Sequence, residues 1–259
     1  MKTIIFDFDG TLGDTLDMWD RVDERLALEV ASPLVKKQLS TSSAWKKEIS
    51  TFRTKSLRSH KDGDIYEEYA SDIGKRYCSN MTGKEINARR SAIAADYMKN
   101  DICLKDGAAE FIKYLKESGY KLVLATVGTK WAIDMYANYN KNINSVLDIY
   151  NTFDLVLTKN EVFKKKPDPE VYLKAMKLSE ARPCECIVFE DSLEGVEASY
   201  AAGIPTMNIY DKHSDYERAE IDKKVIESFM DFNEALKYFK SKKRVKTRWI
   251  SSFSFLFIV

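Results

Sequence analysis

The sequence is poor in the residues that build disulfide frameworks and zinc sites. Four cysteines stand among 259 residues, at Cys78, Cys103, Cys184 and Cys186, together with only two histidines. Cysteines this few and this scattered do not form a disulfide framework, and the scarcity of both residue types argues against a zinc site. Cys184 and Cys186 could form a redox or metal pair. We favour a buried structural thiol, because Cys186 opens an apolar strand.

The sequence also has no run of about 20 apolar residues, the length that a membrane-spanning helix needs. Met1-Lys2 leads directly into an apolar strand without a signal peptide, so we expect a cytoplasmic protein. The formal net charge is +1, which favours neither nucleic acid nor a membrane surface. With 44% apolar and 31% charged residues, the composition is that of a soluble globular protein. A chain of this length can form one core, or one core with a smaller inserted domain.

The first strand and its turn are the most informative stretch. The apolar run Ile4–Phe6 has no polar alternation, which predicts a parallel strand buried on both faces. Asp7 and Asp9 follow it, and Gly10 permits a sharp turn beside them. In open α/β sheets this edge binds ligands. Two carboxylates so close together require a cation or a shared proton, and Mg²⁺ is the natural cation. A plain acid-and-glycine turn would give the same pattern.

From residue 16 to about residue 100 the strand signals stop and the pattern is helical. One amphipathic stripe at spacings of three and four predicts a helix that Pro33 ends. Its apolar members are Leu16, Trp19, Val22, Leu26 and Val30. Further helices are expected at residues 45–57, 65–77 and 84–98.

The stretch from Lys36 to Lys61 is strongly basic and contains a single acid, Glu48. One interpretation is a solvated helix face. The other is that part of the stretch grips an anionic substrate, since Lys and Arg are suited to phosphate and carboxylate. Nucleic-acid binding is the weakest interpretation, because no recognised motif accompanies the charge.

Four more apolar runs predict strands at residues 120–125, 153–157, 186–189 and 204–209. Thr126 follows the first of them, where a hydroxyl next to a helix start can bind a phosphate oxygen, although a simple helix cap is also possible. Glu190 and Asp191 follow the third, and adjacent acids at a strand end again call for a cation. We expect Asp106 and Asp168 to be helix N-caps.

These residues carry a family resemblance. The stretch Asp7-Phe8-Asp9-Gly10-Thr11-Leu12, followed by Asp14-Thr15, resembles motif I of the haloacid dehalogenase superfamily, the aspartate-nucleophile phosphatases and phosphomutases. Thr126 matches the Ser/Thr of motif II. Lys166 matches the lysine of motif III in its Lys-Pro-x-Pro-Glu context, and Glu190-Asp191 with Gly195 matches motif IV. Val127 departs from the small polar residue usual at this position, whose side chain contacts the phosphate or the leaving group in the family.

The resemblance implies an α/β fold, with a doubly wound, Rossmann-like parallel sheet core and an inserted all-helical cap, as in the β-phosphoglucomutase-like branch. Residues 1–14 and 101–241 would form the catalytic core, and residues 15–100 the cap that closes over the site. The basic and then apolar tail, residues 242–259, is expected to stand apart from the fold.

The resemblance also implies a role for each motif residue. Asp7 would attack phosphorus and become an aspartyl phosphate, and Asp9 would act as general acid and then base. Thr126 and Lys166 would hold the phosphoryl group. Mg²⁺ would be held by Asp7, Asp9, Asp191 and Glu190, the last directly or through a water.

The expected function is therefore a Mg²⁺-dependent phosphatase acting on a small phosphorylated metabolite, such as a sugar phosphate. The alternative is a phosphomutase of the β-phosphoglucomutase type, which shares motifs and cap. Dehalogenase chemistry is disfavoured because it does not need Asp9, whereas phosphonatase chemistry stays open because the cap has many lysines. A binding protein without turnover is argued against by the reactive motif residues, and no nucleic-acid partner is expected. The basic segments leave open binding to an anionic polymer.

Overall fold

The computed structural model describes residues 2–60 and 64–243 of the chain. It divides into two compact units, one made of residues up to Asp14 together with the chain from Cys103 onward, the other of Thr15–Ile102. We call them the α/β unit and the helical unit. Most of the predicted tail, residues 244–259, lies outside the described residues, while residues 242 and 243 end the last helix.

The α/β unit is built on a six-stranded sheet in the order β3-β2-β1-β4-β5-β6, in which every neighbouring pair is parallel. The strands are β1 (Thr3–Phe6), β2 (Lys121–Ala125), β3 (Leu155–Leu157), β4 (Cys186–Glu190), β5 (Thr206–Ile209) and β6 (Glu227–Phe229). The first strand lies between β2 and β4, so the chain winds outward on both sides of it. This order confirms the predicted doubly wound parallel sheet. We did not predict β6, because this edge strand has no apolar run.

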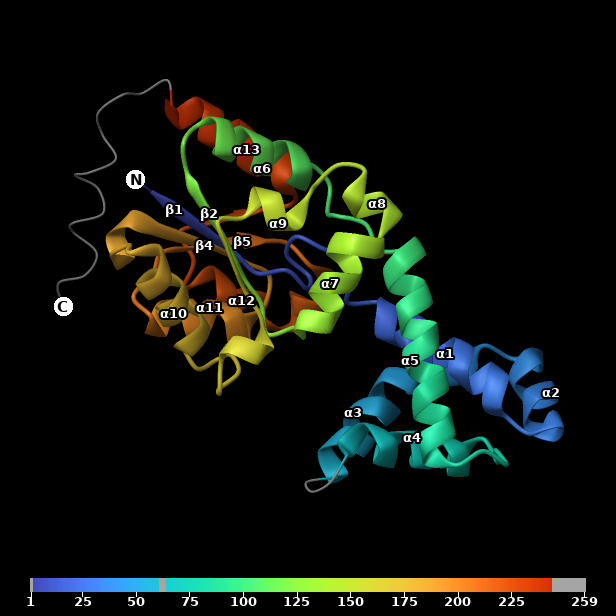
Figure 1. The fold of residues 1–259 in the computed structure, drawn as a ribbon. Helices are drawn as coiled ribbons and strands as arrows, with labels where there is room; N and C mark the ends of the chain where they lie inside the picture. Colours follow the sequence, from blue (N-terminus) through green and yellow to red (C-terminus); the bar gives the residue numbers. More distant parts are fainter. Residues whose placement is uncertain (1, 61–63, 244–259) are drawn as a thin grey trace. The chain divides into compact units, whose positions relative to one another are not determined.

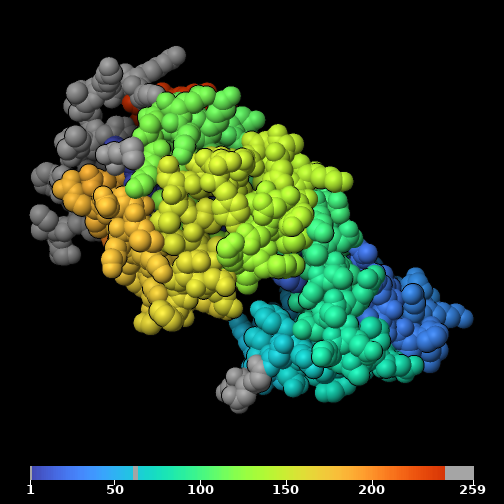
Figure 2. Space-filling model, in the orientation of Figure 1, coloured from blue at the N-terminus to red at the C-terminus, as the bar shows by residue number. Residues whose placement is uncertain are grey.

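Helices cover both faces of this sheet (Figure 1). On one face α6 (Ala108–Glu117) packs with α13 (Phe232–Lys243), and on the other α10 (Glu170–Ser179) lies beside α11 (Leu193–Ala201). The other helical elements of this unit are α7 (Lys130–Tyr139), α8 (Lys141–Asn144), α9 (Ile149–Thr152), α12 (Arg218–Asp222), η2 (Lys159–Glu161), η3 (Pro183–Glu185) and η4 (Lys212–Glu217). In the space-filling view the helices largely hide the strands (Figure 2).

Alternation along β1 and β4 assigns their side chains to the two faces of the sheet. Phe6 and Phe189 stack at 5.1 Å between ring centroids, in a cluster with Phe111 of α6 and Phe232 of α13. Ile5 and Val188 belong to the core on the opposite face, with residues of α10 and α11. By the same period of two, Asp7 and Glu190 are directed to the α10 face.

The helical unit consists of six helical elements within the described residues. These are α1 (Met18–Val30), α2 (Pro33–Thr41), η1 (Ala44–Glu48), α3 (Ile49–Ser59), α4 (Ile65–Arg76) and α5 (Gly83–Asn100). Pro33 separates α1 from α2 by occupying the first turn of α2, where its missing N–H costs no hydrogen bond. We did not predict α2, because it buries no residue and so carries no apolar stripe.

Two predicted N-caps differ from the structure by one residue. α6 is capped by Gly107 rather than Asp106, at φ +77°, and a Cβ there would lie 2.6 Å from the backbone nitrogen of Asn233. Packing against α13 therefore decides that helix start. α10 begins after Pro169, although Asp168 Oδ1 still accepts the Glu170 N–H at 3.1 Å.

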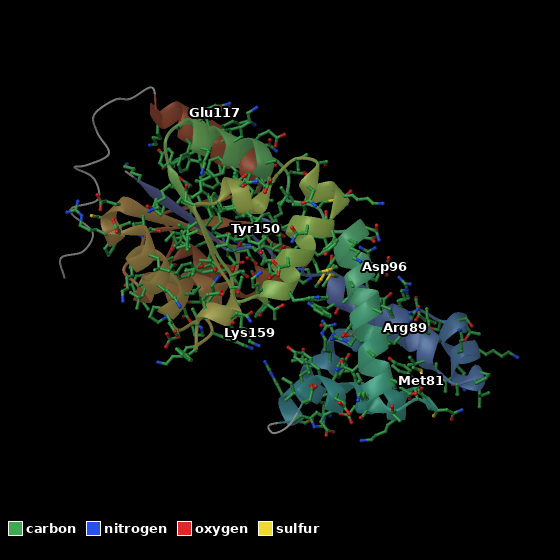
Figure 3. The ribbon with its side chains drawn as sticks, in the orientation of Figure 1. Met81, Arg89, Asp96, Glu117, Tyr150 and Lys159 are labelled. Atoms are coloured by element: carbon green, nitrogen blue, oxygen red, sulfur yellow. The ribbon has the colours of Figure 1, made fainter. Side chains whose placement is uncertain are left out.

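A buried carboxylate, Asp23 of α1, joins four helices of the helical unit. It accepts hydrogen bonds from Arg53 of α3 at 2.8 Å, Tyr69 of α4 at 2.9 Å and Arg90 of α5 at 2.7 Å. The outer side of α5 carries exposed pairs instead, where Arg89 and Asp96 (Figure 3) bind residues of α1. Because Asp23 is fully desolvated, the unit depends on its charge being matched.

In the described part of the chain, no helix combines the length and the apolar character needed to cross a bilayer. None of the four cysteines forms a disulfide within the described residues, and Cys186 is the buried one, in β4, as expected for a structural thiol.

We expect Asp23→Asn to lower the free energy of unfolding of the helical unit by about 3–5 kcal/mol, because two arginines lose a buried counter-charge. Amide hydrogen exchange of residues 15–102 would measure the change in the stability of the helical unit separately from that of the α/β unit. Glu29→Gln is the control, since Glu29 forms partly exposed pairs with Arg25 and Arg89 and should cost about 1 kcal/mol or less. Equal losses in both variants would contradict this.

Candidate active site

The predicted site residues of β1, β2 and β4 meet at one edge of the sheet. The parallel register aligns Phe6 with Phe189 of β4 and with Leu124 of β2. Asp7 therefore lies level with Glu190 on one side and Ala125 on the other, and Thr126 and Asp191 follow one residue later. The carboxyl ends of three neighbouring strands thus bring together side chains that are far apart in the sequence.

Lys166 reaches this edge from the loop after β3. Its Nζ donates to Asp7 Oδ1 at 2.5 Å and to Glu190 Oε1 at 2.6 Å, and it lies 3.4 Å from the carbonyl oxygen of Ala125. Lys166 is buried, whereas Lys164 and Lys165 next to it are exposed. The ammonium group therefore directs all three of its N–H bonds at site oxygens.

Three buried carboxylates form an acidic cluster at the same place. Asp7, Glu190 and Asp191 each offer an oxygen within 4.8 Å of the others. Burial raises the pKa of Asp7 well above its usual range. The Lys166 charge opposes this rise, while repulsion from the neighbouring acids adds to it. Burial and the charge of Glu190 raise the pKa of Asp191 to about 7.

The cluster fits a divalent cation by the chemistry of its donors. A single buried ammonium group lies among three buried carboxylates, which leaves a surplus of negative charge. Burial, together with repulsion among the acids, raises the pKa values of Asp7 and Asp191. A hard cation with carboxylate ligands relieves that surplus. Asp9, which we predicted as a fourth ligand, is half-buried beyond the end of β1, and its charge also raises the pKa of Asp7.

Gly128 brings Asp9 and Thr126 close to each other. A Cβ on Gly128 would lie 2.9 Å from Asp9 Oδ2 and 3.2 Å from Thr126 Oγ1. The Gly128 N–H donates to Thr126 Oγ1 at 2.9 Å. A larger residue here would have to displace the Asp9 carboxylate, so glycine leaves room for both groups after β2. Thr129 caps α7 through the Ala132 N–H and takes no part in these contacts.

Sequence reasoning did not assign a role to two residues that contact the cluster. Thr11 Oγ1 donates to Asp191 Oδ1 at 2.6 Å, and the Tyr172 hydroxyl donates to Glu190 Oε1 at 2.5 Å. Thr11 lies inside the quoted motif I, which was the available signal. Tyr172 gave none, because it has the spacing of an ordinary core residue of α10.

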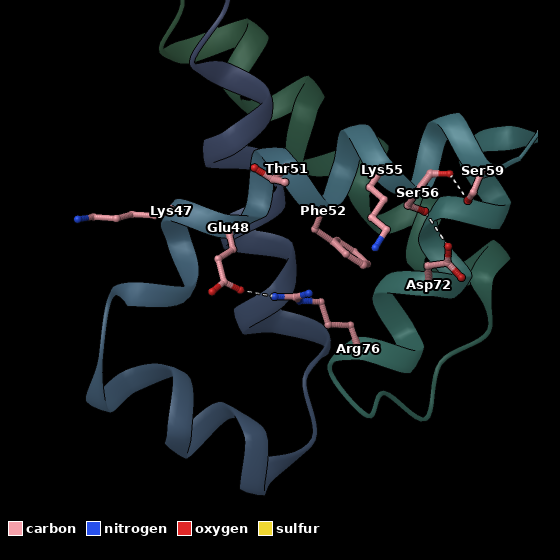
Figure 4. Close-up of a pocket in the computed structure, with 9 residues that line it drawn as sticks. All are labelled: Lys47, Glu48, Thr51, Phe52, Lys55, Ser56, Ser59, Asp72 and Arg76. Atoms are coloured by element: carbon pink, nitrogen blue, oxygen red, sulfur yellow. Dashed lines mark hydrogen bonds and ion pairs between the residues drawn. The ribbon is translucent and has the colours of Figure 1, made fainter.

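The helical unit has a pocket of its own, of about 540 Å³, between α3 and α4 (Figure 4). Lys55 points into it, and the Arg76 guanidinium lies 4.6 Å over the Phe52 ring while binding Glu48. Lys47 extends away from it (Figure 4). The basic stretch of the sequence therefore contributes both a pocket-lining cation and a solvated one.

We expect Gly195→Ala to lower the free energy of unfolding by about 1–3 kcal/mol, although alanine is the better helix former. A Cβ at Gly195 would lie 1.9 Å from Glu190 Oε1 and 2.0 Å from Glu190 Cδ, so the carboxylate would have to leave its place. Urea unfolding measures the change. Glu194→Ala is the control, at an exposed position of the same helical turn, where we expect about 0.5 kcal/mol or less. A stable Gly195→Ala variant would mean that Glu190 is not held where the structure has it.

Two curated proteins are similar to most of the chain. Protein CbbY of Rhodobacter capsulatus is 26% identical over 226 residues, which is 85% of this chain and 91% of that protein. The phosphorylated carbohydrates phosphatase of Thermotoga maritima is 25% identical over 205 residues, or 79% of this chain and 82% of that protein.

Solved structures share the fold. CbbY of Rhodobacter sphaeroides, in complex with phosphate, has a TM-score of 0.61 at 23% identity, covering 90% of this chain and 95% of that one. A Thermotoga maritima candidate β-phosphoglucomutase has a TM-score of 0.69 at 21% identity, covering 93% and 99%. The family model of haloacid dehalogenase-like hydrolases matches residues 4–209, from the first strand to the fifth. The resemblance carried by the four motifs is therefore confirmed, and this chain belongs to the haloacid dehalogenase-like hydrolases.

Proposed function

We propose that this chain is a Mg²⁺-dependent phosphatase that hydrolyses a small phosphorylated metabolite, such as a sugar phosphate, through an aspartyl phosphate. The observation that carries the proposal is the buried Lys166 ammonium held 2.5 Å from Asp7 inside an acidic cluster. The named relatives support the substrate class, since one is a phosphatase of phosphorylated carbohydrates. The family supports hydrolysis as the reaction.

Each chemical step falls to a residue at the sheet edge. A carboxylate oxygen of Asp7 attacks phosphorus, the new O–P bond forms, and the ester P–O bond breaks. Asp9 gives its proton to the departing oxygen. Asp9 then takes a proton from a water that attacks the aspartyl phosphate, which releases inorganic phosphate and restores Asp7.

The surrounding groups bind and neutralise the phosphoryl group. Lys166 donates to its oxygens and cancels part of the charge that develops in the transition state, with Thr126 as a second donor. Asp7 and Asp191, with the Asp9 carbonyl and with Glu190 directly or through a water, would hold Mg²⁺, which supplies further positive charge beside the phosphate. Many groups must share this task, because phosphate monoester hydrolysis calls for rate enhancements of up to about 10²¹-fold.

We propose that the helical unit acts as a cap that closes over the active site and selects the substrate. Its place in the sequence, inserted directly after the turn of β1, supports this role. The basic residues in its stretch from Lys36 to Arg58 suit an anionic substrate. A reducing compartment such as the cytoplasm suits four cysteines that form no disulfide within the described residues.

Phosphate release from a panel of sugar and nucleotide phosphates tests the proposal. We expect release with Mg²⁺, none with a chelator, and a loss of about a thousandfold or more in Asp7→Asn, because the nucleophile is removed. Asp222→Asn is the matched control, since Asp222 is an exposed aspartate of the same unit and should leave the rate within about twofold.

Release that persists in Asp7→Asn would exclude the aspartyl phosphate. If no substrate releases phosphate, the phosphomutase alternative is favoured. Incubation with a hexose 1-phosphate and a trace of hexose bisphosphate then decides, because a mutase yields an isomerised sugar phosphate and a phosphatase yields free phosphate.

A further inference from the structure

Tyr172 lies directly beneath the acidic cluster, at the point where α10 meets the sheet. The side chain is fully buried, its hydroxyl donates to Glu190 Oε1 at 2.5 Å, and Lys166 Nζ lies 4.9 Å from its ring centroid. In this contact the phenol O–H is the donor and the Glu190 carboxylate is the acceptor. One side chain therefore contacts both partners of the buried ion pair.

Glu190 is saturated with hydrogen-bond donors. Its Oε1 accepts from Lys166 and Tyr172, and its Oε2 accepts from the N–H groups of Asp191 and Ser192 and from the Ser192 hydroxyl. These donors fill the roughly four lone-pair sites of a carboxylate. Gly195 leaves just enough room for this arrangement, because a Cβ at that position would overlap the carboxylate. Glu190 would have to give up donors to bind a cation directly.

Asp7 and Asp191 are bound more sparsely. One oxygen of each side chain accepts a hydrogen bond. Asp7 Oδ1 accepts from Lys166 at 2.5 Å, and Asp191 Oδ1 accepts from Thr11 at 2.6 Å. Both carboxylates also belong to the acidic cluster, in which each offers an oxygen within 4.8 Å of the others. A cation would therefore bind most readily to these two carboxylates, because they have the fewest hydrogen bonds to give up.

We propose that Tyr172 is a positioning residue of this active site, which through Glu190 fixes the Lys166 ammonium against Asp7. In this arrangement Glu190 anchors Lys166 and is not a direct ligand of the cation. The inference rests on the proposed function, because the task of Lys166 is to hold a phosphoryl group. Removing the Tyr172 hydroxyl should therefore weaken the binding of phosphate and leave the binding of the cation nearly unchanged.

Calorimetric titration tests this without turnover, using Mg²⁺ alone and then inorganic phosphate in the presence of Mg²⁺. For Tyr172→Phe we expect phosphate affinity to fall about tenfold and Mg²⁺ affinity to stay within about twofold, because the ring remains and one hydrogen bond is lost. Tyr69→Phe is the control, since it removes an equally buried hydroxyl that donates to Asp23 of the helical unit. It should change neither affinity.

A double-mutant cycle with Lys166→Met separates positioning from a loss of packing. If Tyr172 acts through Lys166, Tyr172→Phe has no further effect on phosphate affinity in the Lys166→Met background. Effects that multiply would overturn the proposal, as would unchanged phosphate affinity in Tyr172→Phe itself. Lys166→Arg replaces Lys166→Met if melting curves show that the latter does not fold.

The role of Glu190 is tested with Glu190→Gln beside Asp191→Asn. We expect Asp191→Asn to weaken Mg²⁺ binding at least about tenfold and Glu190→Gln only about threefold or less, because a direct ligand is lost in the first variant and only a more distant charge, already paired with Lys166, in the second. Equal losses of Mg²⁺ affinity in the two variants would mean that Glu190 is a direct ligand, and would refute its proposed role as an anchor of Lys166. Wild-type protein that binds Mg²⁺ and phosphate yet hydrolyses no ester would remove the proposed function, whereas these affinities would still decide the role of Tyr172.

Discussion

The active-site edge depends on one buried charge imbalance. The Lys166 ammonium faces the carboxylates of Asp7, Glu190 and Asp191, none of which has free access to water. Desolvation and mutual repulsion make this arrangement costly in isolation, and the raised pKa values of Asp7 and Asp191 express that cost. In the proposed function, a cation and a phosphoryl group would complete the site and reduce this cost. The uncompensated charge of the carboxylates would then be the source of the site's affinity for a cation.

The parallel sheet makes this concentration of charge possible. β1 and β4 are fully buried, with apolar residues along both faces, and their acidic side chains appear where the strands end. Because β2, β1 and β4 are neighbours in register, their ends present Thr126, Asp7 and Glu190 side by side. The apolar core therefore determines where the polar residues of the candidate site lie, and the helices that cover the sheet pack against them.

The helical unit solves a similar problem without a sheet. Asp23 is buried as deeply as the site carboxylates, but the arginines and the tyrosine around it leave it paired. A carboxylate satisfied by Arg53, Arg90 and Tyr69 holds helices together, whereas a carboxylate left with surplus charge is suited to bind a cation. In the proposed function the same residue type therefore has a structural role in one unit and a chemical one in the other, and the difference lies in its partners.

The sequence by itself determined the strands that carry the motifs, since uninterrupted apolar runs such as Ile4–Phe6 have few alternatives to a buried strand. It also identified Asp7, Asp9, Thr126, Lys166, Glu190 and Asp191 as candidates, because each follows such a run or belongs to a motif. Weakly patterned elements, such as α2 and β6, were missed because they bury little apolar surface. Only the tertiary structure decided that Tyr172 touches Glu190, that Gly195 makes room for its carboxylate, and that Asp23 joins four helices. These contacts connect residues on different elements, and local pattern contains no information about which elements will meet.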